Sequence, residues 1–132
     1  MFKIIRRCYE EVVHDAKRRL PNEACGILSG GTDTATTFYS MVNAEQSPVS
    51  FLMEPKEQFQ VMKEIRLRGE KMLAVSHSHV ASQAYPSAKD ISLALYPEIH
   101  YLIVSLSDRE RPAVRAFRIE EGKAREESIE VV

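Results

Sequence analysis

The sequence predicts an α/β domain in which helices pack on a mixed β-sheet. Stretches with apolar residues at every third or fourth position are interspersed with short apolar runs rich in β-branched and aromatic residues. Some of these runs are joined by turns short enough for hairpins, and others are separated by a helix, so both strand directions are expected. A length of 132 residues suits one domain, and we expect residues 1–132 to form it.

The first half of the chain is expected to begin with a strand at Phe2–Arg6 and a helix at Tyr9–Leu20. Pro21 ends that helix because proline has no backbone N–H to donate. The apolar run Ala24–Ser29 predicts a strand that a Gly-Gly turn closes. Thr34–Val42 is rich in threonine and aromatic residues and predicts the strand that pairs with it.

In the second half, Glu54–Arg68 predicts a helix, with Pro55 suited to its first position and Gly69 to its end. Met72–Ser76 predicts a short strand, and Ser87–Leu95 predicts a third helix. Three further strands are expected at Ile99–Leu106, Ala113–Ile119 and Glu126–Val132.

Charge and cysteine content narrow the classes of function. The chain has 18 Lys and Arg against 19 Asp and Glu, which is not the positive excess of a protein that grips nucleic acid. Two cysteines, Cys8 and Cys25, are too few for a disulfide framework. The sequence shows neither a signal-peptide pattern nor an apolar run of membrane-spanning length. We therefore expect a cytoplasmic protein that binds neither nucleic acid nor membrane.

The residues best suited to chemistry follow the predicted strand at Met72–Ser76. His77 and His79 lie two residues apart, so an extended backbone points both imidazoles to one side. Ser87 and Asp90 lie three residues apart, so a helix places both on one side. Two imidazoles and one carboxylate suit a catalytic zinc site with one open position.

Each part of this pattern also has an ordinary structural explanation. Two histidines at this spacing are frequent in half-exposed strands, and Ser87-x-x-Asp90 is a capping box. A capped helix can still present a metal ligand, so the two interpretations are compatible. Glu23, at the edge of a predicted buried strand, gains interest because a metal hydrolase needs a general base that is not itself a ligand.

Taken together, these residues resemble the signature of the JAMM (MPN+) metalloproteases. Glu23 is followed far downstream by His77-x-His79, seven further residues and Ser87-x-x-Asp90. The segment Pro21–Gly30 is also similar to the one around that family's catalytic glutamate. The resemblance runs from about Phe2 to Leu106. It implies a curved mixed sheet flanked by helices, of the JAMM/MPN, cytidine-deaminase-like type.

By this resemblance, His77, His79 and Asp90 bind one zinc ion per chain. Glu23 is then the general base, and Ser87 donates a hydrogen bond to the oxyanion on the scissile carbonyl. Two neighbouring positions depart from the family pattern: Val80 replaces a usual proline and Ser76 a usual bulky aromatic residue. Neither position is a ligand, so these departures leave open the loop course and the wall of the substrate groove and do not concern the metal.

The resemblance also implies a class of substrate. Few residues separate Asp90 from the next predicted strand, and Ala44–Met53 is short, as in minimal prokaryotic members. Such members act on the C-terminal Gly-Gly tail of a ubiquitin-like or sulfur-carrier protein, for example by releasing cysteine from a carrier adduct. The assembly state stays open, with a homodimer among the possibilities.

Two other classes of function compete with a peptidase. A non-catalytic MPN-type interaction scaffold is the main alternative, but such scaffolds typically lack ligands or the glutamate that this chain keeps. A metal-dependent nuclease is disfavoured by the formal net charge of −1.

Overall fold

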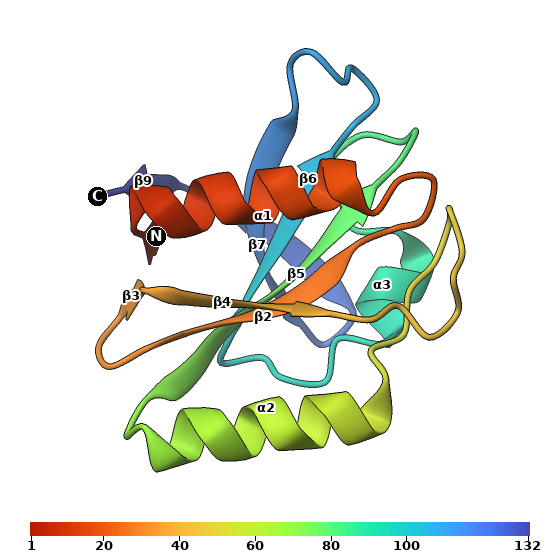
Figure 1. The fold of residues 1–132 in the computed structure, drawn as a ribbon. Helices are drawn as coiled ribbons and strands as arrows, with labels where there is room; N and C mark the ends of the chain where they lie inside the picture. Colours follow the sequence, from red (N-terminus) through yellow and green to blue (C-terminus); the bar gives the residue numbers. More distant parts are fainter.

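The computed structural model describes all 132 residues and is built around a six-stranded mixed sheet (Figure 1). Its two central strands, β5 and β6, run parallel, and every other neighbouring pair is antiparallel. The predicted α/β fold with a mixed sheet is therefore confirmed. In spatial order the strands are β4 (Thr37–Met41), β2 (Cys25–Gly30), β5 (Lys71–His79), β6 (His100–Ser105), β7 (Ala113–Glu120) and β8 (Lys123–Glu127).

A second, three-stranded sheet was not expected. It joins β3 (Thr34–Ala35), β1 (Phe2–Ile4) and β9 (Ile129–Val131), all in parallel pairs, and brings the two ends of the chain together (Figure 1). The predictions of single strands at Thr34–Val42 and Glu126–Val132 are therefore wrong. Each segment is extended throughout but changes partner sheet midway, and side-chain alternation does not record a change of partner.

Two helices pack on opposite faces of the main sheet (Figure 1). Helix α1 (Arg6–Arg18) begins three residues earlier than predicted and buries Val12 and Ala16 against one face. Helix α2 (Pro55–Leu67) begins at proline as predicted, with the Glu54 carboxylate accepting hydrogen bonds from two backbone N–H groups of the first turn. None of the helices is both long and apolar enough to cross a bilayer.

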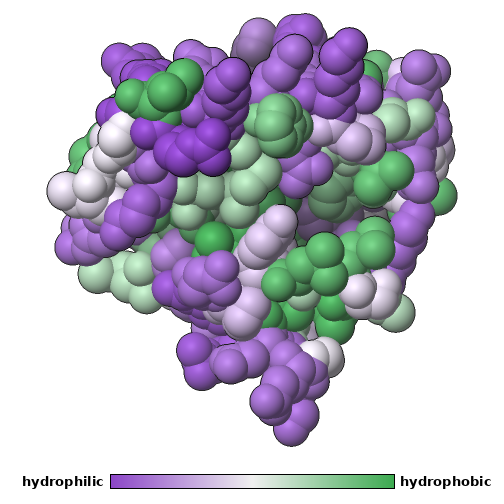
Figure 2. Space-filling view, turned by 90° about the horizontal axis from the view of Figure 1, so that it is seen from below, coloured by the Kyte–Doolittle hydropathy of each residue, from purple (hydrophilic) through white to green (hydrophobic).

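Two separate segments cover the face of the sheet on which α2 packs, and the candidate site lies between them. Helix α2 packs over β2 and β5 through Ile27 and Ile65. The segment 84–96 packs over β6 and β7 through Ile103 and Phe117. It contains α3 (Ala88–Ser92), which is shorter than the predicted helix. On the face seen in Figure 2, apolar side chains gather near the middle among polar ones.

Candidate metal centre

Strand β5 carries both histidines. It was expected to end at Ser76, but it continues to His79, so His77 and His79 project from the same face of a regular strand. β2 is hydrogen-bonded along one side of β5 and β6 along the other. Both imidazoles are almost fully buried. The two side chains are thus fixed on a strand with partners on both sides.

Asp90 reaches the histidines from the first turn of α3. The Ser87 hydroxyl accepts a hydrogen bond from the Asp90 backbone N–H at 3.1 Å, and the Ser87 N–H donates to Asp90 Oδ2 at 2.9 Å, so the capping box is present. The same Oδ2 lies 3.1 Å from His77 Nε2 and 3.0 Å from His79 Nε2. One carboxylate oxygen therefore caps the helix and faces both imidazoles.

The three side chains meet the geometric requirement of a metal site. His77 Nε2 and His79 Nε2 are 3.2 Å apart, which closes a triangle with Asp90 Oδ2. Nitrogen and oxygen ligands at zinc distances and tetrahedral angles are separated by about 3.3–3.5 Å, close to the sides of this triangle. The residues predicted as ligands therefore form a candidate metal site.

The tautomer of His79 is compatible with this assignment. Its Nδ1 lies 2.8 Å from the carbonyl oxygen of Gln83, which can only accept, so Nδ1 carries a proton. In the neutral ring, Nε2 then has no proton, and its lone pair faces the Asp90 carboxylate. The two acceptor atoms, His79 Nε2 and Asp90 Oδ2, are 3.0 Å apart and need a proton or a cation between them. A backbone carbonyl that fixes the imidazole in this way is the usual outer partner of a metal-bound histidine.

The acid–base properties of the other two residues fit a cation as well. Burial lowers the pKa of His77, which favours the neutral imidazole that a metal requires. Burial alone would raise the pKa of Asp90, but the contacts with His77 and His79 hold it well below its usual range. The site thus combines one ionised carboxylate with two nitrogen donors.

Glu23 lies next to this triangle, two residues before the start of β2. Cys25 pairs with His77, and the Ser78 N–H donates to the Ala24 carbonyl at 3.0 Å, so continuation of this register places Glu23 beside His79. Glu23 is 5% exposed and its Oε1 has no hydrogen-bond partner. Burial raises its pKa to about 7. A carboxyl group with that pKa can exchange a proton near neutral pH.

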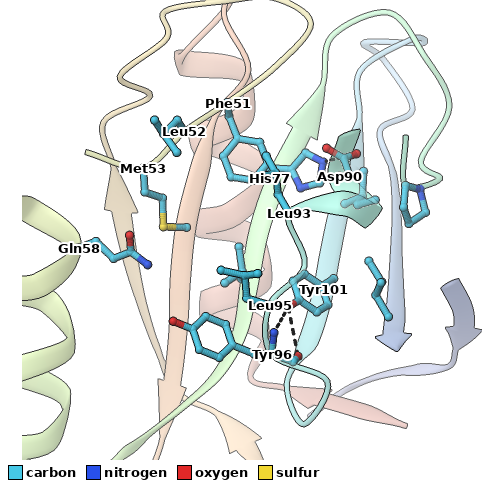
Figure 3. Close-up of a pocket in the computed structure, with 14 residues that line it drawn as sticks. Phe51, Leu52, Met53, Gln58, His77, Asp90, Leu93, Leu95, Tyr96 and Tyr101 are labelled. Carbon is cyan, nitrogen blue, oxygen red and sulfur yellow. Dashed lines mark hydrogen bonds and ion pairs between the residues drawn. The ribbon is translucent and has the colours of Figure 1, made fainter. Parts of the chain in front are cut away.

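An apolar hollow of about 200 Å³ begins at the metal site. Figure 3 shows His77 and Asp90 at one end and Tyr96 at the other. The Phe51 ring stacks on His77 with a centroid distance of 4.5 Å, and the Tyr101 hydroxyl is hydrogen-bonded to the Tyr96 backbone. Most of the lining side chains are apolar, so the hollow suits an extended peptide with apolar side chains.

Ser76 does not line the wall of the apolar hollow. Ser76 alternates with His77 along β5 and faces α1, where it lines a small cavity with Val12 and Ala16. Strand alternation alone could have assigned it to the face opposite the histidines. The loop after Val80 is fixed by the contact between His79 and Gln83.

The remaining sequence candidates are structural. Cys25 is buried, and burial raises the pKa of its thiol to about 12, so it is not a thiolate at neutral pH. His14 is exposed. His100 packs on Phe2 and contacts Glu127 at 2.6 Å.

Two contributors to the site were missed from the sequence: Phe51 and the carbonyl of Gln83. Phe51 lies in a loop without periodicity, and a backbone carbonyl has no residue-type signal at all. The one sequence signal for Phe51 is the apolar run Phe51-Leu52-Met53 just before the predicted helix, which indicates that this part of the loop packs against the protein.

Comparison with known proteins places the chain among related sequences. Residues 6–120 match the family described as prokaryotic homologues of the JAB domain. The chain is 39% identical over 123 residues to the CysO-cysteine peptidase of Mycobacterium tuberculosis, covering 92% of this chain and 84% of that protein. It is 34% identical over 92 residues to the desampylase of Haloferax volcanii, covering 67% and 66% of the two chains.

Solved structures agree on the fold. A Desulfitobacterium hafniense protein superposes with a TM-score of 0.91 at 38% identity, covering 100% of this chain and 93% of that one. A JAB1/MPN domain protein from Archaeoglobus fulgidus gives a TM-score of 0.68 at 23% identity, with 99% and 97% covered, and so supports the fold alone. From the matched length, the identity and the His-His-Asp triangle, this chain is a member of the prokaryotic JAB/JAMM family of metallopeptidases.

Proposed function

We propose that residues 1–132 form one zinc-dependent peptidase or isopeptidase domain that hydrolyses the amide bond after the C-terminal Gly-Gly of a ubiquitin-like or sulfur-carrier protein. The observation that carries this proposal is the convergence of three ligand atoms beside a buried, unpartnered glutamate. The relatives named for CysO-cysteine and for desampylation support the substrate class.

His77, His79 and Asp90 would hold the zinc ion. Two nitrogens and one oxygen are a ligand set that suits zinc and leaves a coordination position open. Bound there, zinc supplies Lewis-acid chemistry, because it lowers the pKa of a water molecule and polarises a carbonyl. The Gln83 carbonyl keeps the His79 ring in the tautomer that this role needs.

Glu23 moves the proton in this proposal. Its carboxylate accepts a proton from the attacking water and then transfers it to the leaving amine. Burial raises the pKa of this carboxyl to about 7 in the metal-free protein. The positive charge of bound zinc would lower that pKa and so favour the ionised carboxylate that accepts a proton.

Ser87 stabilises the negative charge that develops on the scissile carbonyl oxygen. Its hydroxyl oxygen already accepts from the Asp90 N–H, so the hydroxyl hydrogen is free to point toward a substrate. Removal of one such oxyanion donor typically lowers kcat by a factor of about 100–1,000. The side chain is exposed at the edge of the site, where a substrate can meet it.

The hollow receives the carrier's tail. A Gly-Gly terminus is narrow enough to approach the buried histidines, and the apolar side chains beyond it would contact the wall that Phe51 and Leu52 provide. The exposed fraction of Leu52 is 48%, which leaves that wall available to a partner.

The test uses zinc-loaded protein and a sulfur-carrier protein that ends in Gly-Gly followed by one cysteine. Mass spectrometry is expected to show release of the cysteine, and a chelator is expected to stop it. Glu23→Gln should retain zinc but lose a factor of about 10²–10⁴ in kcat. A zinc-loaded protein that leaves every Gly-Gly extension intact would refute the proposal in favour of a non-catalytic scaffold.

A further inference from the structure

We infer that Asn43 is a positioning residue that ties the backbone of Glu23 to the wall of the apolar hollow. The inference rests on the proposed function, because it assigns Asn43 a part in the same reaction. Asn43 follows β4 and is 7% exposed. It contributes no atom to the metal triangle and does not line the apolar hollow.

The Asn43 side chain makes all four hydrogen bonds that an amide can make. Its Nδ2 donates to the carbonyl of Glu23 at 3.1 Å and to the carbonyl of Ser50 at 3.0 Å. Its Oδ1 accepts from the N–H of Glu45 at 3.0 Å and from the N–H of Leu52 at 3.2 Å. A buried amide that is satisfied in this way holds four backbone segments in one arrangement.

Two of those segments belong to functional parts of the site. Glu23 precedes β2, so its backbone is outside the regular ladder, and the loop holds it from both sides. The Glu23 N–H donates to the Ser47 carbonyl at 2.9 Å, and the Glu23 carbonyl accepts from Asn43. The loop 43–53 therefore holds the Glu23 backbone together with the β2–β5 pairing that begins next to it.

The other segment is the wall of the hollow. Leu52 is held by Asn43 Oδ1 and also accepts from the Ala44 N–H at 2.8 Å, while Asn43 and Met53 form an isolated antiparallel bridge. Phe51, which stacks on His77, lies within this clamped turn. One side chain thus connects the proton-transfer residue to the surface that a substrate tail would contact.

The donor and acceptor halves of the amide make separable predictions. Asn43→Asp keeps an oxygen toward the Leu52 N–H but replaces the donor toward the Glu23 and Ser50 carbonyls by an oxygen. We expect kcat to fall about 100-fold, the scale typical of a displacement of roughly 1 Å, with a smaller rise in KM than in Asn43→Ala because Leu52 keeps its acceptor. Asn43→Ala removes both halves, so kcat should fall and KM should also rise. Ser50→Ala is the matched control, because it removes only the exposed hydrogen bond from Ser50 Oγ to Glu45.

The experiment measures kcat and KM of the zinc-loaded variants on the carrier protein extended by one cysteine, together with zinc content and amide hydrogen exchange. The Leu52 N–H donates to Asn43 Oδ1, so its amide should lose protection only in Asn43→Ala. The Glu23 N–H donates to the Ser47 carbonyl, so its amide should lose protection in both Asn43 variants because the loop that carries Ser47 loosens when the Glu23 carbonyl loses its donor. Neither amide should change in Ser50→Ala. Unchanged kcat in Asn43→Asp, or a loss of bound zinc in that variant, would overturn the inference.

The exchange measurement separates this inference from the proposed function. If the wild-type protein cleaves no extended carrier, the proposed function fails, and amide exchange alone decides the role of Asn43. Joint loss of protection at Glu23 and Leu52 in Asn43→Ala then supports the tie between base and wall. Retained protection at either amide in that variant rejects it.

Discussion

The metal centre and the cluster around His100 both pair a buried imidazole with a carboxylate, at opposite ends of β5 and β6. At the His100 cluster, Nδ1 lies 2.6 Å from Glu127 Oε2, and Arg118 Nη2 lies 3.4 Å from the His100 Nε2. Arg118 Nε lies 3.6 Å from the same Glu127 oxygen. Both ring nitrogens have partners, and a guanidinium already supplies positive charge.

At the candidate metal centre, no lysine or arginine contacts Asp90. The carboxylate contacts two imidazoles there, whereas Glu127 contacts one imidazole and the guanidinium of Arg118. The His79 Nε2 lone pair, the His77 Nε2 atom and the Asp90 oxygen all face one point. A buried histidine–carboxylate pair thus offers a candidate metal site where no guanidinium is adjacent and a third ligand atom converges. Four variants test this comparison.

The largest expected effect is on metal affinity. Asp90→Asn removes the only carboxylate of the triangle, so zinc affinity should fall by more than about 100-fold, beyond the loss typical of outer-shell partners. Because the amide oxygen can still accept from the Ser87 N–H, the loss of stability in the metal-free protein should be at most about 1 kcal/mol. Titration calorimetry and thermal denaturation measure the two quantities. Stoichiometric zinc in this variant would mean that Asp90 is only a cap.

Glu127→Gln should show the reverse pattern. Zinc content should stay stoichiometric, while stability at pH 7 falls by about 2 kcal/mol because His100 and Arg118 lose a buried charged partner. Burial would raise the pKa of Glu127, but His100 and the N-terminal amine lower it overall. Its stabilisation is therefore present above pH 4.5 and is lost as the pH falls through the folded-state pKa. Denaturant unfolding at pH 7 and pH 3 should show the difference between variant and wild type shrinking in acid.

Glu23→Gln should stabilise the metal-free protein, by roughly 1–2 kcal/mol at pH 8. The folded-state pKa of about 7 lies above the ordinary value of 4.5, so the folded state binds more protons between these values. The cost of ionising Glu23 in the folded protein is hence absent below pH 4.5 and complete above pH 7. Thermal denaturation in chelator at pH 4 and pH 8 checks this. Equal melting temperatures for variant and wild type at pH 8 would contradict the burial of an ionised carboxylate.

The smallest effect is expected at the exposed pair between Lys89 and Glu45, whose atoms lie 3.1 Å apart beside the metal centre. Lys89→Gln should leave the melting temperature and zinc content unchanged, since exposed ion pairs are screened by solvent and salt. A loss of zinc in this variant would show that charge near the triangle matters without contact, and would weaken the comparison.

The convergence of His77, His79 and Asp90 could be predicted from the sequence because their spacing encodes their geometry. His77 and His79 share a face of any extended strand, and Ser87 with Asp90 shares a side of any helical turn. The mixed sheet and the position of α2 followed from periodicity and from Glu54-Pro55. These features depend on residues that are close in sequence.

What the sequence did not reveal depends on distant partners. The second sheet forms because extended segments at the two ends of the chain pair with each other, and side-chain alternation does not identify a partner. The role of Asn43 comes from four backbone groups spread between residues 23 and 52. The environment of His100 likewise needs a carboxylate 27 residues away.

The position of β5 between two neighbouring strands has a consequence for how a metal ion would be gained and lost. Because β2 and β6 hold this strand by backbone hydrogen bonds that need no ion, emptying and refilling the centre leaves the surrounding sheet intact. Zinc bound there would act as a reversible ligand of a preorganised protein and not as a folding nucleus. Turnover in a cell should accordingly follow the buffered zinc level, with idle protein persisting until the ion returns.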